Sequence, residues 1–221
     1  MPKLYYFALF MLFFSCQKEE KHTKKTNTPN IFLEIAKKGK YKNPRKIDVT
    51  KEIKLYQADS LFKKMSEVEF DTLQLNKKYS FKTMSNGNYF YGFEERQNFN
   101  MLFIYIYKDH YSDVIDMITY DKNWEMISNL ELSRAGGDGG GHWHRKCEFL
   151  NDSIFDITYQ LDFFSLPEHN FENICEKHIT KYKITSNGRI DSLSTQFLVK
   201  QDTNCVKRGR DFFNKINPIK P

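Results

Sequence analysis

The chain contains few of the residues that interrupt regular structure, with only ten Gly and six Pro among 221 residues. This composition excludes a collagen-like or low-complexity chain. A long hydrophobic run is also missing: the longest, residues 4–14, has eleven apolar residues, whereas a membrane-spanning helix needs about 20. The chain has no Gly-x-Ser-x-Gly or His-Glu-x-x-His segment, so two common signatures of hydrolases are absent.

Aromatic residues, in contrast, are abundant, with 20 Phe and 13 Tyr. Aromatic side chains favour the pleated, half-buried surface of a β-sheet. The length accommodates one domain of roughly 150 residues together with additional segments. The composition therefore predicts a mainly β fold with a sizeable core.

Positive charge is concentrated at one end of the chain. The net charge is +6, and residues 17–46 contain ten Lys and Arg but only three Glu. Because Lys3 adds a further positive charge, the remaining residues are slightly negative. A nucleic-acid-binding domain needs a basic surface, so the charge pattern predicts no nucleic-acid partner.

The first sixteen residues have the layout of an export signal. A short positive start at Lys3 precedes the apolar run 4–14, and the small residue Ser15 precedes Cys16. The segment 12–16, Leu-Phe-Phe-Ser-Cys, resembles the lipobox of bacterial lipoproteins, although that pattern usually has Leu and a small residue where Phe13 and Phe14 stand. The resemblance predicts a signal peptide over 1–15 and lipidation at Cys16, whose thiolate is the nucleophile that this modification requires.

The residues after the cysteine predict where the lipoprotein lies. Gln17-Lys18-Glu19-Glu20 resembles the surface-export signal on lipoproteins of the Bacteroidota, with a generic polar tether as the alternative. The resemblance implies an outer-membrane protein that faces the cell surface and has the lipid bilayer as its partner. Stable anchoring takes two or more acyl chains, which an acylated lipoprotein cysteine provides.

Three further segments follow from the residue pattern. Residues 16–46 are polar and Lys-rich, with Pro29 and Pro44, and predict a flexible tether. Residues 47–200 predict a single domain that begins with one amphipathic helix of about four turns, because apolar residues recur there at helical spacing (Leu55, Ala58, Phe62, Met65). Asp48 or Thr50 is the expected helix cap. Residues 201–221 form a C-terminal tail of unassigned role.

Beyond the helix the hydrophobic period shortens to two, which is typical of β-strands. Strands are expected around Val68 and Phe70 and over 79–84, 89–94, 101–108, 114–120, 126–132, 142–149, 154–164, 175–185 and 190–199. Turn-forming residues separate them, including Asn86-Gly87 and Asn187-Gly188. Successive strands are therefore predicted to be antiparallel neighbours, in a meander or sandwich of about eight to ten strands.

With Cys16 lipidated, three cysteines remain: Cys147, Cys175 and Cys205. An oxidising, extracytoplasmic compartment favours one disulfide between two of them, and the sequence does not select the pair. A structural role is expected for this bond, and no cofactor is predicted apart from the covalent lipid.

The most unusual stretch is residues 136–144, Gly-Gly-Asp-Gly-Gly-Gly-His-Trp-His. No Gly-Lys-Ser/Thr follows, so it is not a phosphate-binding loop, and a long mobile hairpin loop is expected instead. His142 and His144 would share one face of a strand, a spacing that holds a metal ion if a third ligand such as Asp138 approaches. The expected role of these residues is structural, with metal binding as the alternative.

One strand provides a binding hypothesis, since Phe103, Tyr105 and Tyr107 share a face opposite Leu102, Ile104 and Ile106. An open Tyr face would suit a glycan or protein ligand, but packing of both rows is the expected outcome. The sequence thus predicts a membrane-anchored extracytoplasmic lipoprotein with a binding or structural role and no catalytic residue. The alternatives are a metal-dependent hydrolase near Asp138, His142 and His144, and a protective or inhibitory lipoprotein that binds a secreted protein.

Overall fold

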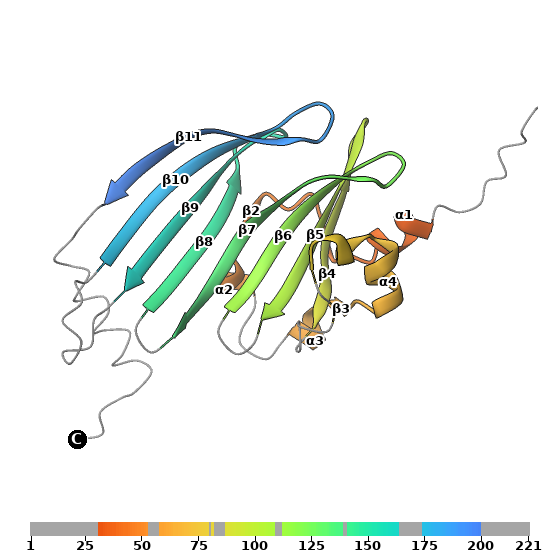
Figure 1. The fold of residues 1–221 in the computed structure, drawn as a ribbon, viewed down its shortest axis with the longest axis horizontal. Helices are drawn as coiled ribbons and strands as arrows, with labels where there is room; N and C mark the ends of the chain where they lie inside the picture. The colour runs from red at the N-terminus through yellow and green to blue at the C-terminus, as the bar shows by residue number, and fades with distance from the viewer. Residues whose placement is uncertain are drawn as a thin grey trace, which may run out of the picture. The chain divides into compact units, whose positions relative to one another are not determined.

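A computed structural model describes residues 31–52, 58–79, 81, 87–108, 112–138, 141–163 and 174–199. Eight long strands form a single antiparallel meander in which each strand pairs with the next in sequence (Figure 1). They are β4 (Asn88–Glu95), β5 (Phe99–Lys108), β6 (Ser112–Asp121), β7 (Met126–Asp138), β8 (Gly141–Phe149), β9 (Ile154–Phe163), β10 (Ile174–Ile184) and β11 (Ile190–Val199). The predicted mainly β, antiparallel fold is confirmed, as a meander rather than a sandwich.

Three two-residue strands complete an 11-stranded sheet. Strand β1 (Tyr41–Lys42) pairs in parallel with β4, and β3 (Lys63–Lys64) pairs with the same strand in antiparallel orientation. Strand β2 (Lys46–Ile47) pairs with the end of β8 that β7 leaves free, because β7 contacts β8 only from Arg134 to Asp138. The segment that precedes the meander is therefore built into the sheet.

The helices are short and lie before the meander. They are α1 (Ile31–Ala36), α2 (Val49–Glu52), α3 (Ala58–Leu61), α4 (Glu67–Thr72) and the 3-10 helix η1 (Leu75–Lys77). Helices α1 and α4 lie beside the β4 side of the sheet in Figure 1. Helix α4 begins with a capping box, in which the Ser66 side chain accepts a hydrogen bond from the Glu69 backbone and Glu69 binds the Ser66 backbone.

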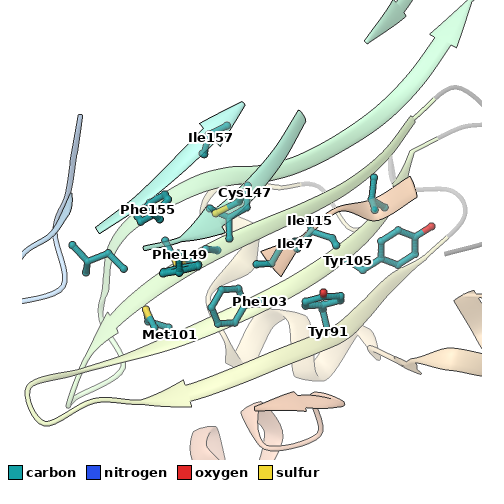
Figure 2. Packing of buried hydrophobic residues seen from close by; sticks show 14 of the residues in the cluster. Ile47, Tyr91, Met101, Phe103, Tyr105, Ile115, Cys147, Phe149, Phe155 and Ile157 are labelled. Carbon is teal, nitrogen blue, oxygen red and sulfur yellow. The ribbon is translucent and has the colours of Figure 1, made fainter. Parts of the chain in front are cut away.

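Two hydrophobic clusters cover the two faces of β5. One cluster joins α1, α4 and η1 to Leu102, Ile104 and Ile106. The other joins Phe103 and Tyr105 to Val49 of α2 and to residues of β8 and β9. Figure 2 labels the β8 and β9 residues Cys147, Phe149, Phe155 and Ile157. Both rows of this strand therefore pack, and its Tyr-bearing face is not open to a ligand.

Residues 31–46 differ from the predicted tether. Ile35 and Ala36 of α1 are buried in the helical cluster, and Tyr41 pairs with Gly92 of β4. A Cβ on Gly39 would lie only 2.7 Å from the Cα of Gly92, so the chain packs closely against the sheet there. The folded unit thus begins at Ile31, because the apolar residues Ile35 and Ala36 pack in the helical cluster and Tyr41 pairs with β4.

The predicted amphipathic helix does not extend to Met65. Helices α2 and α3 occupy parts of it, residues 53–57 with Leu55 lie outside the described residues, and β3 replaces its last turn. Met65 is buried, and its backbone N–H donates to the Asn88 carbonyl oxygen at 2.7 Å. Pairing with β4 therefore ends the helical conformation.

One strand prediction is wrong, and another falls mostly outside the described residues. Val68 and Phe70 lie in helix α4, because the capping box at Ser66 starts a helix and only Phe70 needs burial. The strand expected over 79–84 falls mostly outside the described residues.

The glycine-rich stretch is not a long loop. Strand β7 runs through Gly136 and Gly137 to Asp138, and β8 begins at Gly141. A Cβ on Gly137 would lie 2.5 Å from the carbonyl oxygen of Gly141, which is closer than two nonbonded atoms can approach. The glycines therefore permit a close approach of two paired strands.

Candidate functional site

A row of cationic and aromatic side chains crosses five strands on one face of the sheet. In the strand register Arg134 of β7 is opposite Arg145 of β8, which is opposite Tyr159 of β9. Tyr159 in turn is opposite His178 of β10, and His178 is opposite Phe197 of β11. Because directly paired residues project from the same face of a sheet, these five side chains form a continuous row, which we call the cross-strand row.

The rings of the cross-strand row are in contact. The ring centroids of Tyr159 and His178 are 5.0 Å apart, and those of His178 and Phe197 are 5.5 Å apart. The guanidinium of Arg145 lies 5.7 Å from the centroid of the Tyr159 ring, within range of a cation–π interaction. Phe197 is 57% exposed, so the aromatic end of the row is accessible.

The cationic end of the row has more positive than negative charge. Glu131 accepts a hydrogen bond from Arg134 at 2.6 Å and one from Arg145 at 3.0 Å. A single carboxylate therefore serves two guanidinium groups. Glu176, on the same face, is 2.9 Å from Nδ1 of His178.

Three nitrogen donors at the cationic end of the row lack a hydrogen-bond acceptor. They are the Nε atoms of Arg134 and Arg145 and the indole Nε1 of Trp143, all buried without a hydrogen-bond partner. Trp143 lies two residues before Arg145 on β8 and is opposite Gly136, so it projects from the same face. Buried donors are rarely left unpaired in native proteins, so these three atoms distinguish this end of the row.

The predicted histidine pair lies on the opposite face of β8. Nε2 of His144 is 2.8 Å from Oδ1 of Asp48 at the start of α2. The same carboxylate oxygen accepts hydrogen bonds from the Thr50 hydroxyl and backbone. Burial alone would raise the pKa of Asp48, but the hydrogen bonds from His144 and Thr50 outweigh it and hold the pKa below its ordinary value.

His142 does not complete a metal site with His144 in the described structure. Burial lowers the pKa of His142, an effect that the nearby Asp162 opposes. The side chain of Asp138 lies outside the described part, although its backbone pairs with Gly141. Among the residues that the structure describes, no group of three His, Cys, Asp or Glu side chains is arranged to hold a metal ion.

The cysteines of the described strands differ in state. Cys175 is disulfide-bonded to a partner outside the described residues, whereas Cys147 is a free thiol in the hydrophobic core. Burial raises the pKa of the Cys147 thiol, which keeps it protonated and unreactive. The identity of the Cys175 partner remains a prediction.

Non-reducing peptide mapping is expected to recover the Cys175 peptide linked to the Cys205 peptide, because Cys147 is a free thiol and the predicted lipidation would occupy Cys16. Cys147 should react with iodoacetamide only after unfolding, since it is 3% exposed. A linkage through Cys147, or between Cys175 and Cys16, would contradict this assignment. Labelling of the folded protein in parallel with a urea-unfolded sample provides the control.

The cross-strand row was not found from the sequence, because its members are 11 to 19 residues apart and come together only through the strand register. Two pairs carried a local signal, Glu176 with His178 and Trp143 with Arg145, since residues two apart on a strand share a face. Comparison with known proteins adds no further assignment: no protein-family model, curated protein or solved structure matches the chain.

Proposed function

We propose that the protein is a bacterial lipoprotein held in the outer membrane by acylated Cys16, and that its sheet displays the cross-strand row to a ligand outside the cell. Support for the anchor comes from the sequence of residues 1–20, which lie outside the described residues. Support for binding comes from the row itself, which combines one exposed ring, that of Phe197, with unpaired donors.

The length of the spacer suits display of the folded unit. Residues 17–30 separate Cys16 from α1, the first described element. A fully extended chain spans at most about 3.5 Å per residue, so this spacer reaches at most about 50 Å. None of the helices in the described part of the chain has the length and apolar character needed to cross a bilayer.

Binding is favoured over catalysis because of the kind of groups that the row contains. The row offers hydrogen-bond donors, cations and rings, which recognise a ligand. It contains one described acid–base pair, Glu176 with His178, and these two side chains are hydrogen-bonded to each other. We therefore expect a binding lipoprotein.

Proteinase K added to intact cells of a Bacteroidota host should degrade the protein, because a surface lipoprotein faces the medium. A variant with Lys18, Glu19 and Glu20 all replaced by Ala tests the export residues. We expect this variant to remain acylated but to be protected until the outer membrane is permeabilised. A wild-type protein that survives digestion on intact cells would contradict surface display, and a periplasmic marker protein verifies that the cells are intact.

A further inference from the structure

We propose that the ligand is an acidic sugar, a uronate- or sulfate-bearing glycan whose anionic group binds at Arg134, Arg145 and Trp143. In this arrangement the sugar rings lie along Tyr159, His178 and Phe197. The inference rests on the proposed binding role of the cross-strand row and names the class of ligand that the row accepts.

The unpaired groups at the cationic end are all donors. The Nε atoms of Arg134 and Arg145 and the indole N–H of Trp143 need acceptors. A buried donor without an acceptor destabilises the structure that contains it, so a ligand that brings several acceptor atoms to this place is favoured. Carboxylate and sulfate groups present two or three oxygens in the geometry that guanidinium groups bind.

Charge favours an anionic acceptor over a neutral one. Glu131 neutralises only one of the two guanidinium groups that it contacts. The next carboxylate along the face, Glu176, is engaged by His178. One positive charge is therefore left at the end of the row that carries the unpaired donors.

The aromatic part of the row favours a sugar. Tyr159 and His178 are inclined at 36° and His178 and Phe197 at 57°, so the rings form a twisted surface rather than a flat one. Pyranose rings present apolar C–H faces that stack on aromatic rings, and successive rings of a glycan are free to rotate to follow such a twist. An acidic glycan whose anionic group lies at the cationic end can therefore place its following sugar rings along Tyr159, His178 and Phe197.

Single-stranded nucleic acid combines stacking and negative charge in a similar way, but the remainder of the domain argues against it. Its binding depends on a positive field along the whole strand, and residues 47–221 carry slightly more negative than positive charge. The excess positive charge of the row lies only at Arg134 and Arg145. It therefore suits a ligand that brings one anionic group to this place rather than a continuous line of phosphates.

Isothermal titration calorimetry with the full mature chain tests the proposal. The probes are an alginate hexasaccharide, a chondroitin sulfate hexasaccharide, the neutral cellohexaose and a dodecamer of deoxythymidylate. We expect at least one acidic hexasaccharide to bind, with cellohexaose at least ten times weaker because it lacks the charged acceptor. Alginate and chondroitin sulfate distinguish carboxylate from sulfate recognition.

Three variants locate the site. Trp143→Phe keeps the aromatic ring and removes the N–H, and should weaken binding about 3- to 10-fold. Arg145→Gln should weaken it about 10-fold or more, since the lost hydrogen bond is charged. Phe197→Ala removes an exposed ring and should weaken binding without changing the thermal unfolding midpoint.

Matched controls lie elsewhere on the surface. Arg189→Gln removes an exposed cation whose side chain is 71% exposed, and Leu193→Ala truncates an apolar side chain on β11 that is 50% exposed. Both variants should bind like the wild type. The Lys-rich spacer is present in every protein compared, so its contribution to polyanion binding cancels.

Four results would each overturn the acidic-sugar assignment. Two concern the probes: cellohexaose binds as tightly as the acidic hexasaccharides, or the thymidylate probe binds more tightly than they do. The other two are that all three variants retain wild-type binding, or that neither acidic hexasaccharide binds. None of these results bears on the membrane anchor, which the protease experiment tests separately. The two experiments therefore distinguish a wrong ligand assignment from a wrong lipoprotein proposal.

Discussion

Replacing Cys16 by Ala is expected to move the protein from the membrane fraction to the soluble fraction. The Cys16 thiolate is the nucleophile that the predicted modification requires, and each buried acyl CH₂ contributes about 0.8 kcal/mol to membrane binding. Ultracentrifugation of cell lysates followed by immunoblotting measures the distribution.

The control for this experiment is a second cysteine variant, Cys147→Ala. Cys147 lies in the hydrophobic core on β8, so its removal should change stability modestly and leave the protein in the membrane fraction. Retention of the Cys16→Ala variant in the membrane after a carbonate wash would contradict anchoring through this residue. It would instead indicate that the apolar run 4–14 stays attached.

Replacing Phe103 by Ala should lower the free energy of unfolding by about 3 to 5 kcal/mol. Phe103 is fully buried in the cluster that joins β5 to β8, β9 and the segment around α2. Truncation would leave a cavity that closes only in part, because the backbone of β5 is fixed by pairing with β4 on one side and β6 on the other. Urea unfolding followed by tryptophan fluorescence measures the change.

The matched variant is Phe197→Ala, which removes the same side chain from the exposed end of the cross-strand row. Its effect on unfolding should be within about 0.5 kcal/mol, as for most surface substitutions. A Phe103→Ala variant that loses less than about 1 kcal/mol would show that this face of β5 is not a core. That result would restore the alternative in which the Tyr-bearing face binds ligand.

Eight strands of the meander could be predicted because their two-residue period and turn chemistry are local signals. The turn at Asn187-Gly188 illustrates this, since Gly188 has a φ of 89° that glycine adopts without strain. The predicted strand 190–199 has the same ends as β11. The two-residue period and the turn residues indicate the same strand boundaries at such positions, so the strand can be predicted from the sequence.

The helical region was predicted less well because its elements are fixed by tertiary contacts. Helices α2 and α3 have four residues each, too short for periodicity to reveal. Their conformation depends on contacts such as the Val49 backbone N–H, which donates to the Ser133 hydroxyl of β7 at 2.9 Å. The capping box at Ser66 and Glu69 was a local signal and would have identified α4.

The candidate site illustrates the same limit more strongly. The Gly-rich stretch and the two histidines stood out in the sequence, yet His144 binds Asp48 on one face while Trp143 and Arg145 project from the other. Composition marks unusual residues, whereas a binding face depends on which residues the register aligns. The alignment of Arg145 with Tyr159 follows from the length of the turn between β8 and β9, and the sequence pattern fixes such lengths only approximately.

A lipoprotein requires an acylated Cys16, and intact-mass spectrometry of the protein extracted from membranes determines the chemical state of this residue. We expect a chain of residues 16–221 whose mass exceeds the polypeptide mass by a diacylglyceryl group, with or without a third acyl chain, all of it on the Cys16 peptide. A mass equal to the unmodified 221-residue chain would contradict the account, because residues 1–15 would then be retained and the protein would not be a lipoprotein.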